Sequence, residues 1–404
     1  MNPVKLTDTP FLKKLQMFSF ALIGIGAIGT AVAFFTDAQR ALAGYVVAFS
    51  YVFGLGVTGM FFSALQYAVR AGWSAAVRRI AELFAESIWL IIVGFLPIIF
   101  GMKQLFPWAW ENPAQWTGGG EGYHGHSLHL IHEKQQDFLN PEFFYVRVVL
   151  YILIWVAMYF VIVRNSIKQD NLPNDFRGTR INLKRSAPFI ILYALSTTFA
   201  GFDLLMSLET TWFSTMFGVY FFSGNFVATL SLVGIILAAL QRGGYLKNYL
   251  RGEHFHDIGR LMFAFSIFFA YIAFSQYMLI WYSNIPEETE YFLKRINGGW
   301  EYFGYFTVFF HFVVPFFLLL RQDVKRKTGF IIVGGLIILT AHFIDLSWVV
   351  LPVFSKHLRF GYQEICTFSL MMGLFLFFVA SGFRKYSAVA VNDPYIKESL
   401  EYSA

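Results

Sequence analysis

Ten apolar runs dominate the 404-residue chain, and each is long enough to cross a lipid bilayer as an α-helix. A helix needs about 20 residues to cross a hydrocarbon layer of ~30 Å. The runs occupy residues 16–35, 41–69, 83–105, 143–163, 187–208, 212–241, 259–283, 298–320, 328–354 and 363–383. Only 14% of the residues are charged, against roughly 25% in soluble domains. The sequence therefore predicts an all-α integral membrane protein whose first run is a transmembrane helix and not a cleaved signal peptide.

Basic residues lie in the short loops between the runs, and their distribution predicts the orientation. If the N-terminus is cytoplasmic, 23 of the 31 Lys and Arg residues lie on the cytoplasmic side and seven lie outside, with Arg147 inside a run. Loops rich in Lys and Arg remain in the cytoplasm, so we expect both termini there. The net charge of +6 is therefore a topology signal, and we expect no nucleic-acid partner.

Short motifs recur in the same order along the chain and indicate an internal repeat. The four matched pairs are Ala64-Leu65-Gln66 with Ala239-Leu240-Gln241, Val77-Arg78-Arg79-Ile80 with Ile258-Gly259-Arg260-Leu261, Ile162-Val163-Arg164 with Leu319-Leu320-Arg321, and Phe202-Asp203-Leu204 with Ile344-Asp345-Leu346. They predict two parallel-repeat four-helix bundles over 41–208 and 209–355, flanked by 1–40 and 356–404. One long outside loop, 106–142, belongs to the first bundle. The alternative is that apolar helices resemble one another by composition alone.

Several ionisable side chains lie inside the apolar runs, where a charge costs at least ~2.5–3.5 kcal/mol and usually has a use. His342 and Asp345 are three residues apart and share one helical face. Counted from the cytoplasmic ends, Glu86 lies ~9 Å up, His311 ~13 Å, His342 ~21 Å, and Asp203 and Asp345 ~25 Å. These five groups at increasing depth, which we call the ladder, predict a proton path. In this path Arg147 either holds one aspartate ionised or closes the path. The alternative is that these groups only join helices through hydrogen bonds.

We expect this chain to bind no metal or redox cofactor of its own. A single cysteine, Cys366, excludes an internal disulfide and a Cys-ligated iron–sulfur cluster. The ~8 Å difference in depth between His311 and His342 argues against two axial ligands of one haem. The outside loop holds four histidines, whose spacing matches no closed tetrahedral pattern: His124, His126, His129 and His132. Hydrogen-bonded surface histidines are therefore favoured there over a Zn²⁺ or Cu²⁺ site.

Aromatic residues crowd the outer ends of several runs. They are Trp281, Tyr282, Trp300, Tyr302, Tyr305 and Trp348. Such residues form the interfacial belt of membrane proteins, and they also suit an apolar cleft for a quinone ring. Both interpretations stay open, and we assign no quinone-binding residue.

Two stretches carry a resemblance to a known family. They are Thr198–Ser207, which contains Asp203, and Leu65–Ile80, which follows the second run. With its ten runs and doubled core, the chain resembles the polysulfide-reductase membrane-subunit (NrfD-like) family. Within that family it is most similar to the smaller NrfD-like subunits of alternative complex III, a bacterial quinol:cytochrome c oxidoreductase.

The resemblance implies an integral subunit of a respiratory quinol-oxidising complex in the bacterial cytoplasmic membrane. The implied partners are lipids, iron–sulfur and multihaem cytochrome c subunits on the outer face, and a sister NrfD-like subunit that binds quinol. Those partners would carry the haem c and the iron–sulfur clusters. The implied role is assembly together with proton translocation or quinol-linked proton transfer, with Asp203, His342 and Asp345 at the matching positions. The alternatives are a stand-alone secondary transporter and a purely structural membrane anchor.

Overall fold

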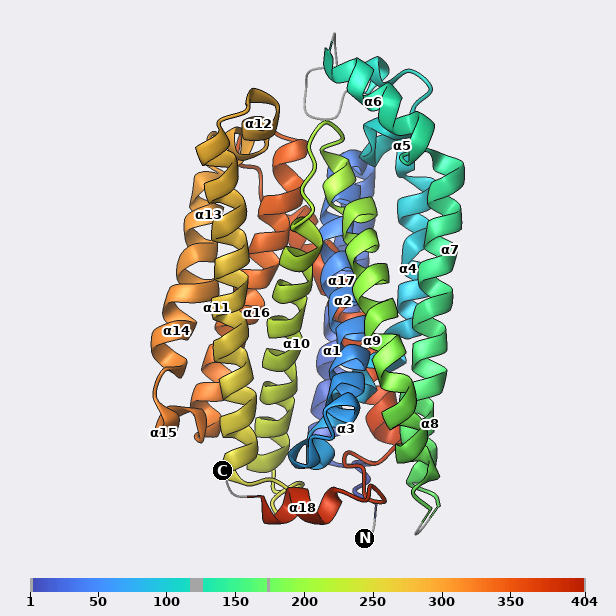
Figure 1. Ribbon diagram of the computed structural model, residues 1–404, viewed down its shortest axis with the longest axis vertical. Helices are drawn as coiled ribbons and strands as arrows, with labels where there is room; N and C mark the ends of the chain where they lie inside the picture. Colours follow the sequence, from blue (N-terminus) through green and yellow to red (C-terminus); the bar gives the residue numbers. More distant parts are fainter. Residues whose placement is uncertain (1–2, 117–125, 173–174, 403–404) are drawn as a thin grey trace.

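The computed structural model describes residues 3–116, 126–172 and 175–402. Its long helices run side by side in one elongated bundle, as Figure 1 shows. Within these ranges, ten helical segments are long and apolar enough to cross a membrane. This confirms the predicted all-α, multi-pass membrane protein.

The first five spans are built from seven α-helices and three shorter segments. They are α1 (Pro10–Thr36); α2 (Ala38–Ala68); α3 (Arg78–Phe84), η2 (Ala85–Ser87) and α4 (Ile88–Phe100); α7 (Pro141–Met158), η5 (Tyr159–Val163) and α8 (Arg164–Gln169); and α9 (Arg177–Leu204) with η6 (Met206–Leu208). Between them lie η1 (Gly72–Ala76), α5 (Met102–Leu105), η3 (Pro107–Ala109), η4 (Pro113–Gln115) and α6 (His126–Asp137). We call α2 to η6 the first half.

Five further spans complete the set of ten in the described residues. They are α10 (Phe217–Arg242); α11 (Gly252–Ser283); α13 (Glu301–Thr307), η7 (Val308–Val313) and α14 (Val314–Leu319); α16 (Thr328–Val350) with η8 (Leu351–Val353); and α17 (Tyr362–Lys385). Outside them lie α12 (Pro286–Arg295), α15 (Gln322–Lys325) and α18 (Ile396–Glu401). We call α10 to η8 the second half. The division into two repeated bundles stays a prediction.

Local sequence signals set the helix starts. Thr9 caps α1 because its side chain accepts a hydrogen bond from the Leu12 amide at 3.3 Å. Asn140 caps α7 in the same way, with the Phe143 amide 2.9 Å away. Each cap is followed by proline, whose fixed φ suits the first helical position. Both caps satisfy amides that would otherwise lack partners.

Helices α2 and α10 form the centre of the molecule. In the most apolar stretch of α2 100% of the residues are buried, and in that of α10 89%, whereas in α1 only 22% are buried. Helix α2 packs on α9, and α10 packs on α16, while α17 covers α2 and α1 covers α17. The outward faces of the peripheral helices are therefore left to lipid.

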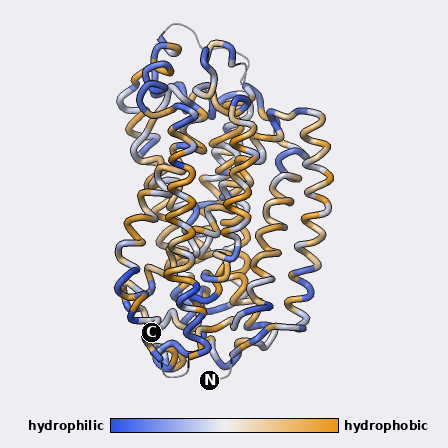
Figure 2. The backbone as a smooth tube through the Cα atoms, turned by 90° about the vertical axis from the view of Figure 1, so that its right-hand side faces the viewer, coloured by the Kyte–Doolittle hydropathy of each residue, from blue (hydrophilic) through white to orange (hydrophobic). Residues whose placement is uncertain are grey.

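The two ends of the bundle are polar and its middle is apolar (Figure 2). Both termini lie at the end that carries α18, and α6 and α12 lie at the opposite end (Figure 1). An even number of spans places both termini on the same side, as the basic loops predict. We refer to the end that carries α18 as the cytoplasmic end, following that prediction.

Two π-helical segments interrupt the fourth and eighth spans. They are η5 and η7, and each is continued by an α-helix. π-Helical segments are rare in proteins, but those that occur are often found at functional sites. The wider turn redirects side chains and leaves backbone groups free. Segment η5 carries Tyr159 and η7 carries His311. Both residues belong to the buried polar groups described next.

Candidate functional site

A cluster of five buried polar residues lies in the interior of the second half. We call Tyr220, Asn225, His311, His342 and Asp345 the histidine cluster. The Tyr220 hydroxyl donates a hydrogen bond to the Asp345 carboxylate. His342 Nε2 lies 3.2 Å from Asn225 Oδ1, and the imidazole centroids of His342 and His311 are 5.9 Å apart. The fold thus brings together three residues of the predicted proton path.

The histidine cluster contains imidazole nitrogens without hydrogen-bond partners. Among the described residues, both ring nitrogens of His311 and Nδ1 of His342 are buried and have none. Leaving a buried polar atom unpaired costs roughly 1–3 kcal/mol, and native interiors usually satisfy such groups with ordered water. The hydroxyls of Ser266 on α11 and Thr307, four residues before His311, are also buried and unpartnered. The second half therefore contains several buried polar atoms whose hydrogen-bonding capacity ordered water would satisfy.

The walls of the histidine cluster are an aromatic ring and a glycine. Phe269 of α11 stacks on His311 with centroids 3.8 Å apart and on Tyr220 at 5.2 Å. Gly224 faces His342, and a Cβ added there would lie 3.0 Å from Nδ1. Glycine at 224 therefore gives the imidazole the space in which it sits. A larger residue would push the ring or its solvent aside.

The relative depth of the two histidines differs from the sequence prediction. Residue counting put His311 and His342 ~8 Å apart along the membrane normal, but the ring centroids are only 5.9 Å apart. The count assumes straight α-helices and ignores where side chains lean. His311 lies in the π-helical segment η7, which breaks that assumption.

In the first half, Asp203 has a fixed counter-charge. Arg147 Nε and Nη2 donate to the two carboxylate oxygens of Asp203, each at 2.8 Å. The Tyr151 hydroxyl donates to the same carboxylate at 2.7 Å. A bidentate, charge-assisted pair of this kind is strong and geometrically specific. Around Asp345, by contrast, no described cation lies within ion-pairing distance, and the Tyr220 hydroxyl is its side-chain donor.

Glu86 occupies a third, separate position near the cytoplasmic end of the first half. The Tyr159 hydroxyl donates to its carboxylate at 2.8 Å. In the described chain, no hydrogen bond or ion pair links Glu86 or Asp203 to the histidine cluster. The residues of the predicted ladder therefore occupy three places. Their role in proton transfer stays a prediction.

A buried ion pair lies next to the outer end of the histidine cluster. Arg295 of α12 lies 3.2 Å from Glu209 and donates to the Val349 carbonyl oxygen at 2.7 Å. Val349 is four residues after Asp345 on α16. Lys294 also contacts Glu209. Residue counting placed Lys294 and Arg295 in an outer loop and gave them no role, because their partner is more than 80 residues away in the sequence.

The cytoplasmic end holds a buried ionic network that the sequence interpretation missed. Arg78 binds Asp393 and lies 3.7 Å from Glu82. Arg79 lies 3.0 Å from Glu82 and 3.0 Å from Asp170. The third span therefore begins at Arg78, five residues before the predicted run at 83. The charged residues can enter the helix because they neutralise one another.

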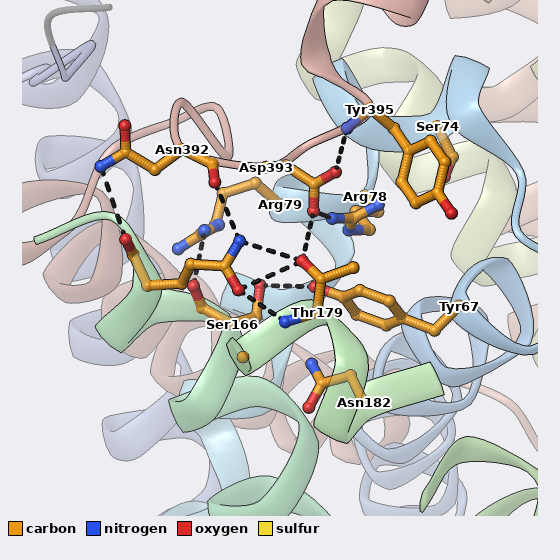
Figure 3. Close-up of polar contacts among 12 residues, drawn as sticks. Tyr67, Ser74, Arg78, Arg79, Ser166, Thr179, Asn182, Asn392, Asp393 and Tyr395 are labelled. Atoms are coloured by element: carbon orange, nitrogen blue, oxygen red, sulfur yellow. Dashed lines mark hydrogen bonds and ion pairs between the residues drawn. The ribbon is translucent and has the colours of Figure 1, made fainter. Parts of the chain in front are cut away.

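The C-terminal tail supplies one side of this network. Figure 3 shows the tail residue Asp393 bonded to Arg78 and Thr179, with the Tyr395 backbone N–H donating to the same carboxylate. Further along the tail, Ser399 donates to the Trp73 carbonyl oxygen at 2.7 Å, and Tyr402 donates to Asp257 at 2.7 Å. The tail thus covers the cytoplasmic ends of both halves. The one signal available beforehand was the pair of arginines beside Glu82.

The histidines of the outside loop make ordinary surface contacts where the structure describes them. His132 Nδ1 lies 3.0 Å from Gln135 Oε1, and His129 Nδ1 lies 3.8 Å from Glu133. His124 lies outside the described residues. No group of three or more His, Cys, Asp or Glu side chains in the described ranges could hold a metal ion.

Two of the outer aromatic residues are structural, and the others face outward. Trp300 Nε1 donates to the Ser355 carbonyl oxygen at 2.9 Å, and Trp348 Nε1 donates to the Arg295 carbonyl oxygen at 3.0 Å. The remaining four are exposed: Trp281, Tyr282, Tyr302 and Tyr305. Exposed aromatic side chains at this level suit the membrane–water interface.

Comparisons with known proteins give no family for the chain. No family model matches it, and no curated protein matches it. The functional conclusion therefore depends on the geometry above and on the resemblance.

Proposed function

We propose that this chain is an integral membrane subunit of a respiratory quinol:cytochrome c oxidoreductase of the alternative complex III type, and that it moves protons through its second half. The complex would lie in the bacterial cytoplasmic membrane with both termini of this chain in the cytoplasm. Its partners would be iron–sulfur and multihaem cytochrome c subunits on the outer face and a sister NrfD-like subunit that binds quinol. The chain itself would contribute no redox cofactor.

The unpartnered imidazole nitrogens beside Asp345 carry this proposal. An imidazole and a carboxylate both change protonation state within reach of neutral pH when their surroundings allow it. His311 and His342 need water to satisfy three ring nitrogens, and water between titratable groups is the means by which protons move through a protein interior. Asp345 has no described cation to hold its charge fixed. These features support transfer through the second half more than through the first.

The Arg147–Asp203 pair supports a different role for the first half. The Asp203 carboxylate accepts hydrogen bonds from two guanidinium nitrogens of Arg147, each at 2.8 Å, and this strong, geometrically specific pair joins α7 to α9. The pair would therefore stabilise the first half and supply a fixed charge. The transport role of Asp203 that the ladder predicted thus becomes the weaker part of the proposal.

Purification from native membranes tests the assignment to a complex. The tagged chain should elute from size exclusion together with c-type haem absorbance and the electron paramagnetic resonance signals of iron–sulfur clusters. A strain without the tag controls for non-specific retention. A chain that elutes alone and colourless would contradict the proposal and would favour a secondary transporter or a structural anchor.

A further inference from the structure

An apolar cavity of about 250 Å³ lies between the α6 region and the segment that joins α9 to α10. Both elements are at the end of the molecule opposite the termini (Figure 1). Most of its lining is apolar, from Phe138, Phe202, Met206, Trp212 and Phe213, and one wall carries Lys134. An apolar pocket with a few polar groups is the usual form of a small-molecule site.

Lys134 brings an unneutralised charge to this cavity. Its Nζ donates to the Thr210 carbonyl oxygen at 2.6 Å and lies 5.2 Å from the Phe213 ring centroid. In the part of the chain that the structure describes, no carboxylate is paired with it. Burial lowers the pKa of Lys134 to about 8, so the side chain is still mostly protonated at pH 7. An ammonium has three N–H donors, and the hydrogen bond to Thr210 uses one of them. Lys134 can therefore donate to an anionic ligand as well.

Trp212 provides a second, independent indication of a ligand. Its indole is buried and stacks on Tyr291 with centroids 3.8 Å apart. Its Nε1–H finds no acceptor among the described residues. A buried indole N–H normally has a partner. Two residues that line the cavity, Lys134 and Trp212, thus carry donors with capacity for a further acceptor.

The surroundings of the cavity indicate that the ligand comes from the bilayer. Phe143, Phe199 and Phe213 are exposed large apolar residues on the elements around it. On a membrane protein such faces meet acyl chains. A basic side chain at the level of the headgroups attracts anionic lipid, and its alkyl stem can lie along apolar surface. A charged phosphate and an acyl chain together match both kinds of lining.

We propose that this cavity binds an anionic phospholipid, with an acyl chain against Phe202, Met206 and Phe213 and a phosphate oxygen at Lys134 and Trp212. A zwitterionic lipid offers the same phosphate, but its own cation opposes the Lys134 ammonium. The site should therefore prefer a net negative headgroup. This inference does not depend on the proposed respiratory function.

Quenching of Trp212 by brominated lipid tests the site in the full chain. The protein is placed in nanodiscs of phosphatidylcholine that contain a small fraction of either brominated phosphatidylglycerol or brominated phosphatidylcholine. The fluorescence of Trp212 is the difference between the signals of wild type and Trp212→Phe. The variant Trp281→Phe gives the fluorescence of an exposed tryptophan in the same way. We expect brominated phosphatidylglycerol to occupy the Trp212 site about fivefold more tightly than the brominated choline lipid. At Trp281 the two lipids should quench alike.

Substitutions of Lys134 test whether its positive charge causes the preference for the anionic lipid. Lys134→Gln should abolish the preference, while Lys134→Arg and the outside control Lys103→Gln should retain it. Thermal unfolding of each variant checks that it folds. Equal quenching by the two lipids in wild type, or an undiminished preference in Lys134→Gln, would overturn the proposal. So would displacement of the bound lipid by a short-chain quinone at lower concentration than by soluble phosphatidylglycerol, because that outcome identifies a neutral carbonyl ligand.

Discussion

Arg147 holds Asp203 in a bidentate ion pair, with both nitrogen–oxygen distances at 2.8 Å. The motif Phe202-Asp203-Leu204 resembles Ile344-Asp345-Leu346 in the second half, yet Asp345 has a tyrosine hydroxyl where Asp203 has a guanidinium. Two similar motifs therefore place one acid beside a fixed positive charge and the other beside a neutral donor. This difference supports the proposal that Asp203 has a structural role and Asp345 a transport role.

Removing Arg147 should strongly destabilise the chain. Arg147→Leu leaves the Asp203 carboxylate buried without its counter-charge, and breaking a buried ion pair in this way costs about 3–5 kcal/mol. The combined Arg147→Leu and Asp203→Leu variant should lose much less, because neither charge is left alone. Denaturant unfolding in mixed micelles measures both variants against wild type. A single variant as stable as the double variant would contradict the structural role.

Replacing His311 should affect transport and leave stability almost unchanged. His311→Phe removes two unpartnered nitrogens and keeps an aromatic ring against Phe269. The free energy of unfolding should therefore change by no more than about 1 kcal/mol, while proton transfer is lost. If His311 instead joined helices through hydrogen bonds, the variant would unfold more easily and retain transport. Thermal unfolding and a pH-indicator dye in sealed vesicles distinguish these outcomes.

The docked tail should depend on one buried carboxylate. Asp393→Ala removes the carboxylate that the tail contributes to the ion pair with Arg78. We expect the free energy of unfolding to fall by about 3 kcal/mol. This is the lower end of the range for a broken buried pair, because Glu82 still lies near Arg78. The released tail should also become a protease site. Lys397→Ala on the exposed face of the same tail is the matched control. Limited proteolysis followed by mass spectrometry compares them, and equal resistance would show that the pair does not hold the tail.

Lys134 should give the chain a pH-dependent stability in a neutral detergent. Burial lowers the folded-state pKa of Lys134 from 10.5 to about 8. Between these values the unfolded chain binds more protons than the folded chain, so the stability contributed through this group rises as the pH increases from about 8 toward 10.5. Lys134→Gln should remove this rise, and Lys103→Gln should keep it. A pH profile of the unfolding midpoint measures the effect, and identical profiles for Lys134→Gln and wild type would refute it.

The spans could be predicted because length and apolarity in a bilayer leave few options. The second run, predicted at 41–69, is observed as Ala38–Ala68, since Asp37 caps the helix just before it. The third span could not be delimited in this way, because Arg78, Arg79 and Glu82 look like loop residues until their pairing in space is known. A method that counts charged residues along the sequence cannot detect ion pairs between residues that are far apart in the sequence.

Three of the five residues of the histidine cluster were predicted, but Tyr220, Asn225 and the arrangement of the cluster were not. His342 and Asp345 could be placed on one face because helical spacing is regular. The partners of each group come from other helices: Arg147 reaches Asp203 across 56 positions and Tyr220 reaches Asp345 across 125. Periodicity carries no information on such contacts. The same limit hid Glu209 beside Arg295 and the tail residue Asp393 beside Arg78.

The ratio of protons released to electrons transferred tests the central claim most directly. Sealed vesicles from cells that carry wild type, Asp345→Asn or the control Ser347→Ala would be energised with quinol while external pH and cytochrome c reduction are recorded together. We expect Asp345→Asn to lower the number of protons released per electron, or to slow turnover with it, and Ser347→Ala to match wild type. An Asp345→Asn variant with unchanged stoichiometry and unchanged turnover would contradict proton movement through the second half.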